Sequence, residues 1–433
     1  MILDIINRNS KASAGVMIVS MGTGLHFLVD SMCACCLFLL ADGEGMQQLL
    51  GVFMVYNILA FLTQPLTGMM ADRIGQPKML MSLSVALLSF GVAVASLGFL
   101  LFTSILLGLG NSFFHVWGGR LVAVQTANDI RALGVFVSTG AFGLAVGMAF
   151  HSWVLLYAFL FAIVGMTIYT LRKISSIDSV CEVSFVPNQL KPWMIWCSAL
   201  VLMAVVMLRS QTSECFSAEM EKGRTVMLII GAVAMLGKAT GGFLAKGVGI
   251  VWTIALVLTG VVLASLFSKW VLGLLCVNLS MSVTLYLINL AMPGREGLAF
   301  GLLASALVPG YMVAQFSEGG FSVIPSLMAT LLLTIIIELL VLRSLRERRA
   351  DVLWSSVVVN ILTNVTLNLF VTYVSNSVVV IIMSEVFVVL IEALWYWYFV
   401  KQWHQAIVYS FLCNGISFLL GLLAQFMILF LTL

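Results

Sequence analysis

Residues 68–78 read GMMADRIGQPK and separate two long apolar runs, 46–71 and 78–98. The segment opens on a glycine, carries an Asp–Arg pair at Asp72 and Arg73, and ends on a lysine. Apolar runs of about 20 residues are long enough to cross a bilayer as helices. The sequence therefore predicts two membrane-spanning helices joined by a short charged turn at the membrane surface.

The composition of the whole chain indicates that lipid is its solvent. Of 433 residues, 62% are hydrophobic and 9% are charged, whereas about 25% of the residues of a soluble domain are charged. The net charge of +3 is too small to indicate a nucleic-acid partner. No phosphate-binding glycine loop of the Walker type is present, which excludes ATP as the energy source. No soluble catalytic motif is present either, so we expect no enzyme and no cofactor.

Hydropathy predicts fifteen membrane spans. Backbone polar groups in lipid must be paired within their own segment, so each span is expected to be helical and the protein to be all-α. Twelve spans come first, and three more follow a basic stretch that ends near residue 349. The expected spans are 14–40, 46–71, 78–98, 99–119, 131–150, 152–171, 192–209, 225–245, 249–267, 270–290, 296–316, 321–342, 352–374, 377–399 and 405–431.

The longest polar stretch inside the chain, 172–191, divides the first twelve spans into two sets of six. This layout is typical of transporters built from two repeats around one central site. A glycine-rich stretch at 237–249 follows the same pattern in the second set as residues 68–78 in the first. We therefore expect a first half at 1–171, a cytoplasmic linker at 172–191, a second half at 192–349 and an additional membrane segment of unknown role at 350–433.

Lysine and arginine are concentrated on one side of this topology. Sixteen fall on the side of the N-terminus and four on the other side, while Lys238 lies within a span. Basic residues favour the cytoplasmic side, so we expect a multi-pass plasma (inner) membrane protein with a cytoplasmic N-terminus. On this count Arg209 marks the extracellular end of the seventh span.

Residues 68–78 resemble the signature loop of the major facilitator superfamily, G-x-x-x-D-R-x-G-x-[RK]-[RK], at the place between spans two and three where that family has it. Pro77 departs from the pattern at a usually basic position. The resemblance implies two six-helix halves, here with about three additional C-terminal helices, and a cytoplasmic gate. The expected gating residues are Gly68, Asp72, Arg73, Gly75, Lys78 and Arg120.

Other stretches of the first half resemble the fosmidomycin-resistance-like efflux family within that superfamily. Residues 108–121 (GLGNSFFHVWGGRL) are similar to its G-x-G-x-x-x-F-H-P-x-G-x-R segment, with Val116 in place of the proline. Residues 26–30 (HFLVD) resemble its H-F-x-x-D, and residues 140–147 resemble its glycine-rich fifth helix. Residues 350–433 resemble no family that we recognise.

His26 and Asp30 lie four residues apart and therefore share one face of the first helix. A carboxylate near the middle of a span is costly and normally faces a cavity or a partner. We interpret the two residues as a proton-coupling pair, in which Asp30 takes and releases a proton and His26 either tunes it or binds substrate. The alternative is a buried polar pair that fixes the first helix to its neighbours.

Several other polar residues inside spans are candidates for substrate binding. Lys238 is the best anchor for an anionic ligand, although its side chain could instead extend to the interface. Histidine and amide side chains in these positions also serve as packing groups, and that alternative remains for each. The candidates are Tyr56, Asn57, Gln64, Asn111, His115, Lys238, Asn289 and Gln315.

The additional segment has a polar pattern of its own. Three asparagines recur every four residues, and two glutamates lie seven residues apart, each set on one helix face. These groups could bind a cation, relay protons or contact a lipid headgroup, or they could join helices through hydrogen bonds. The residues are Asn360, Asn364, Asn368, Glu385, Glu392 and Asn414. We expect no metal site, because Cys33 and Cys35 point to opposite sides of their helix.

These observations favour a monomeric, proton-coupled secondary transporter that exports a small polar or anionic organic molecule. The direction is the least constrained part of this hypothesis, since symporters and antiporters share one fold. An uptake symporter or a transporter of a lipid-like substrate is the first alternative. A membrane receptor or scaffold that does not transport is the second.

Overall fold

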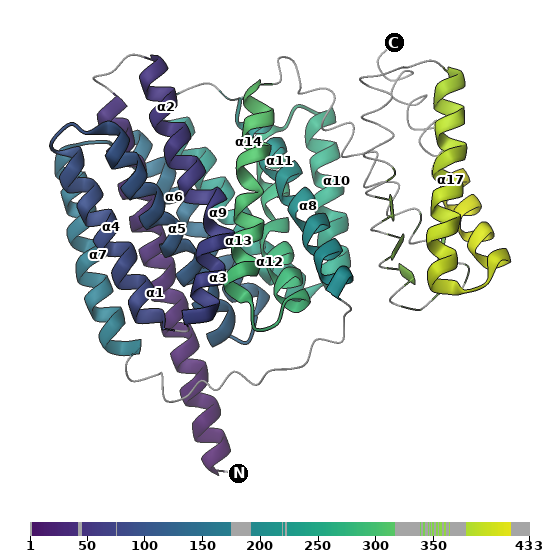
Figure 1. Ribbon diagram of the computed structural model, residues 1–433, viewed down its shortest axis with the longest axis horizontal. Coiled ribbons are helices and arrows are strands. Elements are labelled where there is room, and N and C mark those ends of the chain that lie inside the picture. The colour runs from purple at the N-terminus through teal and green to yellow at the C-terminus, as the bar shows by residue number, and fades with distance from the viewer. Residues whose placement is uncertain are drawn as a thin grey trace. The chain divides into compact units, whose positions relative to one another are not determined.

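A computed structural model of the chain describes residues 2–41, 46–74, 76–174, 192–218, 220, 223–316 and 378–416, and scattered positions between 338 and 363 (Figure 1). Within these ranges all regular secondary structure is helical. The chain divides into two compact units, Met1–Glu318 and Gly319–Leu433, and each is described by itself.

Two groups of helices, one from each expected half, form the first unit. The first group is α1 (Ile2–Ala41), α2 (Met46–Asn57), the π-helical turn η1 (Ile58–Leu62), α3 (Gln64–Ile74), α4 (Pro77–Ala95), α5 (Leu100–Gln125), α6 (Ile130–Ala149) and α7 (Trp153–Ile174). The second group is α8 (Pro192–Ala218), α9 (Arg224–Gly247), α10 (Ile250–Leu266), α11 (Trp270–Asn278), α12 (Ser280–Ala291), α13 (Glu296–Ser305) and α14 (Leu307–Phe316).

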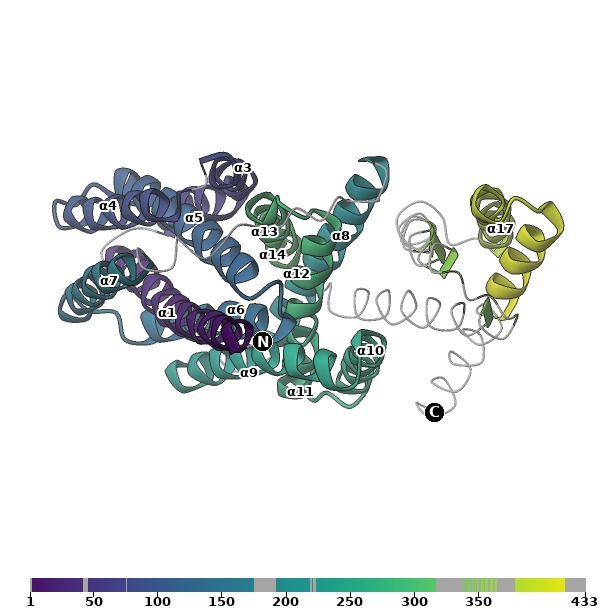
Figure 2. The ribbon, with the colours of Figure 1, turned by 90° about the horizontal axis from the view of Figure 1, so that it is seen from below.

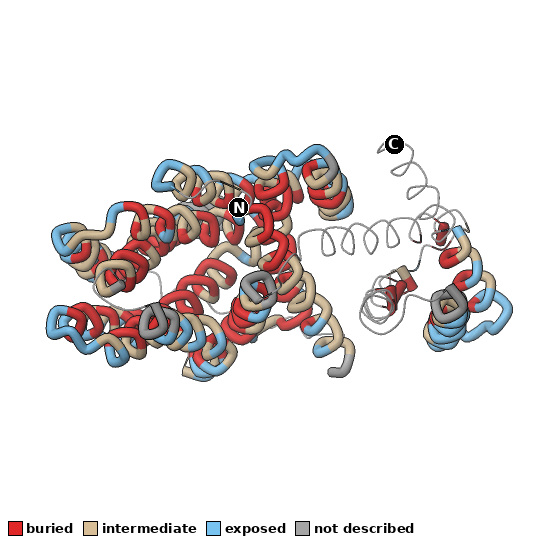
Figure 3. The backbone as a smooth tube through the Cα atoms, turned by 90° about the horizontal axis from the view of Figure 1, so that it is seen from above, coloured by how far each residue is buried: buried red, intermediate tan, exposed pale blue. Residues whose placement is uncertain are grey.

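Ten of the described helical stretches are long and apolar enough to cross a membrane, and two shorter apolar stretches accompany them. Buried residues lie on the helix faces that meet other helices, and exposed residues lie toward the periphery (Figure 3). The peripheral faces carry large apolar side chains, including Phe90, Phe161 and Trp252, which are 61%, 74% and 71% exposed. Such faces suit lipid rather than water, and the prediction of an all-α membrane protein is confirmed.

The first eleven expected spans correspond to described helices, and most of their expected boundaries agree with the helix ends to within a few residues. Pro77, the departure from the signature pattern, is the first residue of α4. Proline suits that position because the missing N–H would have no partner in the first turn of a helix.

The main difference from the expected spans is at the seventh span, since α8 continues to Ala218. Arg209 therefore lies inside a helix and is buried, so its expected place at the extracellular end was wrong.

The second span is not one regular helix. The π-helical turn η1 separates α2 from α3 and places one extra residue in the turn. Single π-helical turns within helices are frequent at functional sites. Here η1 separates Tyr56 and Asn57, at the end of α2, from Gln64, at the start of α3.

Helix α6 lies between α1 and α9 and joins the two halves of the first unit (Figure 2). Glycines on α6 bring these helices close, because a Cβ at Gly143 would collide with the carbonyl oxygen of Phe27 on α1. At the other contact, Gly231 of α9 lies against Ala145 of α6. These contacts leave no room for a side chain at either glycine, so small residues of α6 and α9 set the distances between the helices.

The described part of the second unit contains α17 (Val378–Val400) and a helical stretch at 403–416. Its core includes Val341, Leu342, Tyr396 and Tyr409. Residues of the expected twelfth span therefore pack with the expected additional segment rather than apart from it. Most of 321–342 and 352–374, and the end of 405–431, lie outside the described residues, so the three additional helices and the boundary at 350 remain predictions.

We expect Gly143→Val to destabilise the first unit by about 1–3 kcal/mol, because overpacking against a backbone carbonyl cannot be relieved by a side-chain movement. Thermal unfolding of the full chain in detergent, followed by intrinsic fluorescence, would measure the change. Gly165→Val is the matched control, since a Cβ at Gly165 meets no atom within 4 Å. Equal unfolding temperatures for the two variants would contradict this account of the α1–α6 contact.

Candidate functional site

Two histidines and one aspartate meet inside the first half. His26 and Asp30 come from α1, and His115 comes from α5. The histidines are buried, at 4% and 7% exposed, while the Asp30 side chain keeps 16% exposure. The shared face of α1 that was expected from the four-residue spacing is therefore the one that meets α5.

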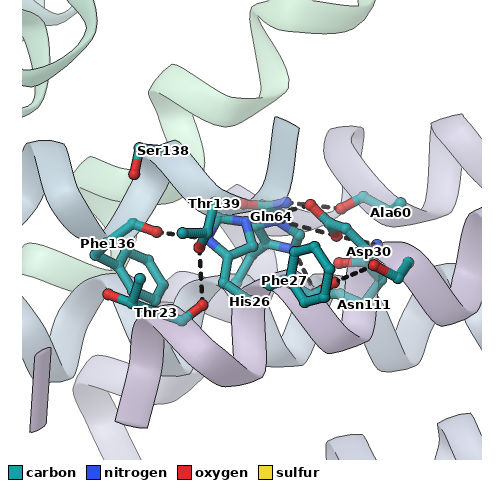
Figure 4. Close-up of polar contacts among 12 residues, drawn as sticks. Thr23, His26, Phe27, Asp30, Ala60, Gln64, Asn111, Phe136, Ser138 and Thr139 are labelled. Carbon is teal, nitrogen blue, oxygen red and sulfur yellow. Dashed lines mark hydrogen bonds and ion pairs between the residues drawn. The ribbon is translucent and has the colours of Figure 1, made fainter. Parts of the chain in front are cut away.

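The two imidazole rings approach each other through their Nε2 atoms. His26 Nε2 lies 2.9 Å from His115 Nε2. The opposite nitrogen of each ring faces a backbone carbonyl, with His26 Nδ1 2.8 Å from Phe136 O and His115 Nδ1 3.1 Å from Asn111 O. Figure 4 shows the contact between His26 and the Phe136 carbonyl on one side of the ring, with Asp30 and Asn111 on the other side.

This arrangement determines where the hydrogens lie. A carbonyl oxygen only accepts hydrogen bonds, so each Nδ1 must carry a hydrogen. In a neutral imidazole the other nitrogen, Nε2, is then a bare acceptor. Two bare acceptors 2.9 Å apart repel each other, so the observed contact requires a proton between His26 and His115.

Asp30 lies beside this shared proton. Its Oδ2 is 3.3 Å from His26 Nε2, and its Oδ1 is 3.7 Å from His115 Nε2. Asn111 Nδ2 donates to Asp30 Oδ1 at 3.4 Å and to the Tyr56 hydroxyl at 2.5 Å. The carboxylate therefore offsets the positive charge of the shared proton, and we call His26, Asp30 and His115 the proton triad.

Helix α6 closes the proton triad on a further side. A Cβ at Gly140 would collide with both His26 Nε2 and Asp30 Oδ2. The glycine-rich stretch at 140–147 thus lets α6 approach the titratable groups closely. The three donor atoms also lie within 4.8 Å of one another, so the proton triad has the donor set to hold a small cation in place of the proton.

Two cations of the second half belong to the same electrostatic region. The charge of Lys238 on α9 interacts with those of Asp30 and His115 in the first half and of Arg209 on α8. Arg209 is buried and donates from Nη1 to Thr284 Oγ1 at 3.2 Å. Lys238 of the second half therefore acts electrostatically on the proton triad of the first, and Arg209 acts on Lys238.

Three of the expected gating residues, Gly68, Asp72 and Arg120, lie where α3 of the first half contacts α13 of the second half. Asp72 Oδ1 accepts from Arg120 Nε and from the backbone N–H of Gly297, each at 2.9 Å. Asp72 Oδ2 accepts from the backbone N–H of Leu298 at 2.9 Å. The carboxylate thus binds the N-terminus of α13, where unpaired N–H groups and the helix dipole favour a negative charge.

Close backbone packing supports this contact. A Cβ at Gly68 would collide with the carbonyl of Gly297, so α3 and α13 approach without intervening side chains. A second contact joins the halves nearby, because Asn289 Nδ2 donates to Asn128 Oδ1 at 3.0 Å. The two halves are therefore in contact at the end of the molecule where Asp72 lies. Arg73 is exposed, and Gly75 lies outside the described residues.

The structure places the remaining substrate-binding candidates in different surroundings. Asn57 and Gln64 donate to carbonyls of their own helical turns, Phe53 O and Ala60 O. Gln64 is fully buried, and its Oε1 has no hydrogen-bond partner. Asn289 belongs to the contact between the halves, and the side chain of Gln315 lies outside the described residues.

The polar groups of the second unit form two carboxylate-centred contacts. Glu392 accepts from Thr363 Oγ1 at 2.8 Å and from Asn414 Nδ2 at 2.5 Å. Asn360 donates to Glu338 rather than to Glu385, and Glu385 is half-buried. Asn364 and Asn368 lie outside the described residues, so the expected asparagine stripe is seen at Asn360 alone among the residues that can be described.

Sequence reasoning missed two groups in particular. Arg209 was assigned to a surface because an apolar run was taken to end at the first charge. Glu338 was overlooked as a single acid within the expected span 321–342, although it is fully buried and accepts hydrogen bonds from Asn360 and Tyr396. Its apolar neighbours on both sides were the available signal, whereas the polar stretch 210–214 after Arg209 gave no such signal.

Comparison with known proteins identifies the fold. No family model matches the chain, and no curated protein matches its sequence. Among solved structures, a variant of the E. coli fucose:proton symporter is similar, with a TM-score of 0.50 and 11% sequence identity. The match covers 74% of this chain and 97% of that one.

The likeness shows that the chain has the major facilitator fold, as the signature loop implied. The finer resemblance to the fosmidomycin-resistance-like family remains a hypothesis.

We expect Asp72→Asn to open the contact between α3 and α13. Hydrogen bonds to charged groups contribute about 1.5–3 kcal/mol each, so loss of the charge would shift the balance of gate states by roughly tenfold or more. Spin labels at the exposed positions Gln76 and Arg295, in a cysteine-free background, would report a larger population of long distances.

Asp129→Asn is the matched control for this experiment. A hydrogen bond from Arg131 holds the pKa of Asp129 below its ordinary value, so the control also removes a charge that is paired at neutral pH. Asparagine still caps α6, and Asp129 makes no described contact with α13. An unchanged distance distribution in Asp72→Asn would show that the carboxylate does not hold this gate.

Proposed function

We propose that the protein is a proton-coupled secondary transporter of a small polar or anionic organic molecule. The observation that carries the proposal is the contact between His26 Nε2 and His115 Nε2, which requires a proton beside the Asp30 carboxylate. A membrane-embedded group that holds an exchangeable proton next to a carboxylate is suited to couple proton movement to transport. The earlier assignment of Asp30 and His26 as the coupling pair is thereby extended to His115.

The contacts between the halves support an alternating-access mechanism. Asp72 on α3 holds the N-terminus of α13 and thus joins the halves at one end. Such a contact can break as the halves rotate about a central site. If the proton triad loses its proton, the positive charge between His26 and His115 that offsets Asp30 is removed. Lys238 is the cation of the second half whose charge interacts with Asp30. Protonation could therefore alter the attraction between the halves.

Export remains our leading hypothesis for direction, because the first half resembles an efflux family. Uptake by symport, or transport of a lipid-like substrate with help from residues 350–433, is the alternative. A receptor or scaffold without transport is less well supported, since charged groups inside a membrane are costly. Asp30, Lys238 and Arg209 are all retained inside spans of the first unit.

We expect Asp30→Asn to abolish proton-driven accumulation while sparing exchange of substrate for substrate. Asparagine keeps the shape of the side chain but cannot offset the charge of the shared proton, whereas exchange needs the conformational change without net proton movement. Substrates would be found by screening sugars, carboxylates and phosphonates for proton flux in proteoliposomes that contain a pH-sensitive dye. Accumulation under a pH gradient and counterflow would then be compared for wild type and variant.

His151→Gln is the control, because His151 lies between α6 and α7, apart from the proton triad. His151→Gln should leave both accumulation and counterflow unchanged. His115→Gln should lose proton-driven accumulation and keep counterflow, as expected for Asp30→Asn. Retained accumulation in Asp30→Asn would remove Asp30 as the coupling group. Stoichiometric zinc bound by the wild type and lost in both Asp30→Asn and His115→Gln would show that the site holds a metal cation rather than a proton.

A further inference from the structure

Arg209 is a buried cation whose hydrogen-bonding capacity is only partly used. It lies in the interior of α8 and is 4% exposed. Its Nη1 donates to Thr284 Oγ1 at 3.2 Å, but its Nη2 is buried without a hydrogen-bond partner. A guanidinium is a rigid, planar fork of five N–H donors, so the Nη2 side of this fork is available to an acceptor that the described residues do not supply.

The charge of Arg209 is also not neutralised by the described part of the chain. The ion pairs found there involve Asp30, Asp72, Asp129 and Glu347 with other partners. None of them includes Arg209 or Lys238. Charged side chains inside a membrane are usually paired or face a functional cavity. Two neighbouring cations that form no ion pair with any described residue therefore point to a negative group that comes from outside the chain.

Lys238 places this pair at the interface between the halves. Its side chain is partly exposed, and its charge interacts with Arg209 in its own half and with Asp30 and His115 in the other. A substrate held by these cations would thus be close enough to the proton triad for its charge to be felt there. This is the location that a transporter with two halves uses for its central site.

We propose that the substrate carries an oxyanion group, either a carboxylate or a phosphate, and that Arg209 and Lys238 bind it. The guanidinium fork matches two oxygens of such a group, and the ammonium adds a flexible point charge. Asp30, a carboxylate of the other half, binds no anion; it serves the proton. The proposal rests on the transport function above, because it takes the region between the halves to be the substrate site.

A structural role for Arg209 makes a different prediction. If the guanidinium only joins α8 to Thr284 on α12, its replacement would destabilise the protein and change no response to anions. The two roles are separated by measuring oxyanion binding directly rather than transport. Lys238 provides an independent variant, since it makes no described hydrogen bond and its removal need not weaken the packing of α8.

The experiment uses the purified full chain in lipid nanodiscs. Thermal unfolding would be followed with inorganic phosphate, benzoate or neutral benzamide, at constant ionic strength set by chloride. A ligand that binds only the folded protein stabilises it by RT ln(1 + [L]/Kd), so the unfolding temperature rises with ligand concentration. Phosphate and benzoate distinguish the two oxyanion classes, and benzamide tests whether the charge is needed.

We expect one oxyanion, but not benzamide, to stabilise the wild type. Its apparent affinity should fall roughly tenfold to a hundredfold in Arg209→Gln and in Lys238→Met, because each loses a charge-assisted bond. Arg209→Lys should restore part of it. Lys246→Gln, which removes an exposed cation from the same helix as Lys238, should match the wild type.

The proposal is overturned if neither oxyanion stabilises the wild type, or if stabilisation persists in both Arg209→Gln and Lys238→Met. Should Arg209→Gln fail to fold, Lys238→Met decides the result. Because this measurement needs no transport, it is separate from the test of the proposed function. If an oxyanion binds but no proton-driven transport is found, the oxyanion site is supported and the proposed proton coupling is rejected. If proton-driven transport is found but no oxyanion binds, only the oxyanion site is rejected.

Discussion

The close contact of α6 with α1 on one side and α9 on the other is the constraint on which the rest of the first unit depends. Small residues at this contact let backbones approach, which is a main source of helix association in lipid, where apolar burial gives no net drive. The contact also sets the chemistry. Gly140 lies directly against His26 and Asp30, and the Phe136 carbonyl of the same helix fixes the orientation of the His26 ring. The helix that joins the halves thus also determines the protonation geometry of the site.

Hydropathy was sufficient to find most spans because the bilayer imposes one length and one secondary structure on each of them. The internal irregularities were not predictable in the same way. The π-helical turn at Ile58–Leu62 changes which face Gln64 presents, yet its residues are ordinary apolar ones. Arg209 was misplaced because its neighbours in the sequence are partly polar, whereas its burial depends on α12, about 75 residues away.

For the site, the four-residue spacing of His26 and Asp30 was enough to place them on one face. The pairing of His26 with His115 joins residues 89 positions apart, and no local pattern in a single sequence contains that information. The two carbonyl contacts that determine the hydrogen positions depend on main-chain geometry at Phe136 and Asn111, which side-chain identities do not reveal. In the second unit, the partner of Asn360 proved to be Glu338, again through packing of segments that a periodic stripe cannot specify.

The unequal distribution of charge between the halves has an electrical consequence. Moving one elementary charge through the membrane potential is worth about 2.3 kcal/mol per 100 mV. An anion and a proton that cross together carry no net charge, so their joint uptake would be indifferent to voltage. An anion that leaves while a proton enters shifts two charges in the same electrical sense, and a negative interior would drive that cycle. For a substrate anion bound by Arg209 and Lys238, the voltage dependence of the cycle is therefore tied to its direction.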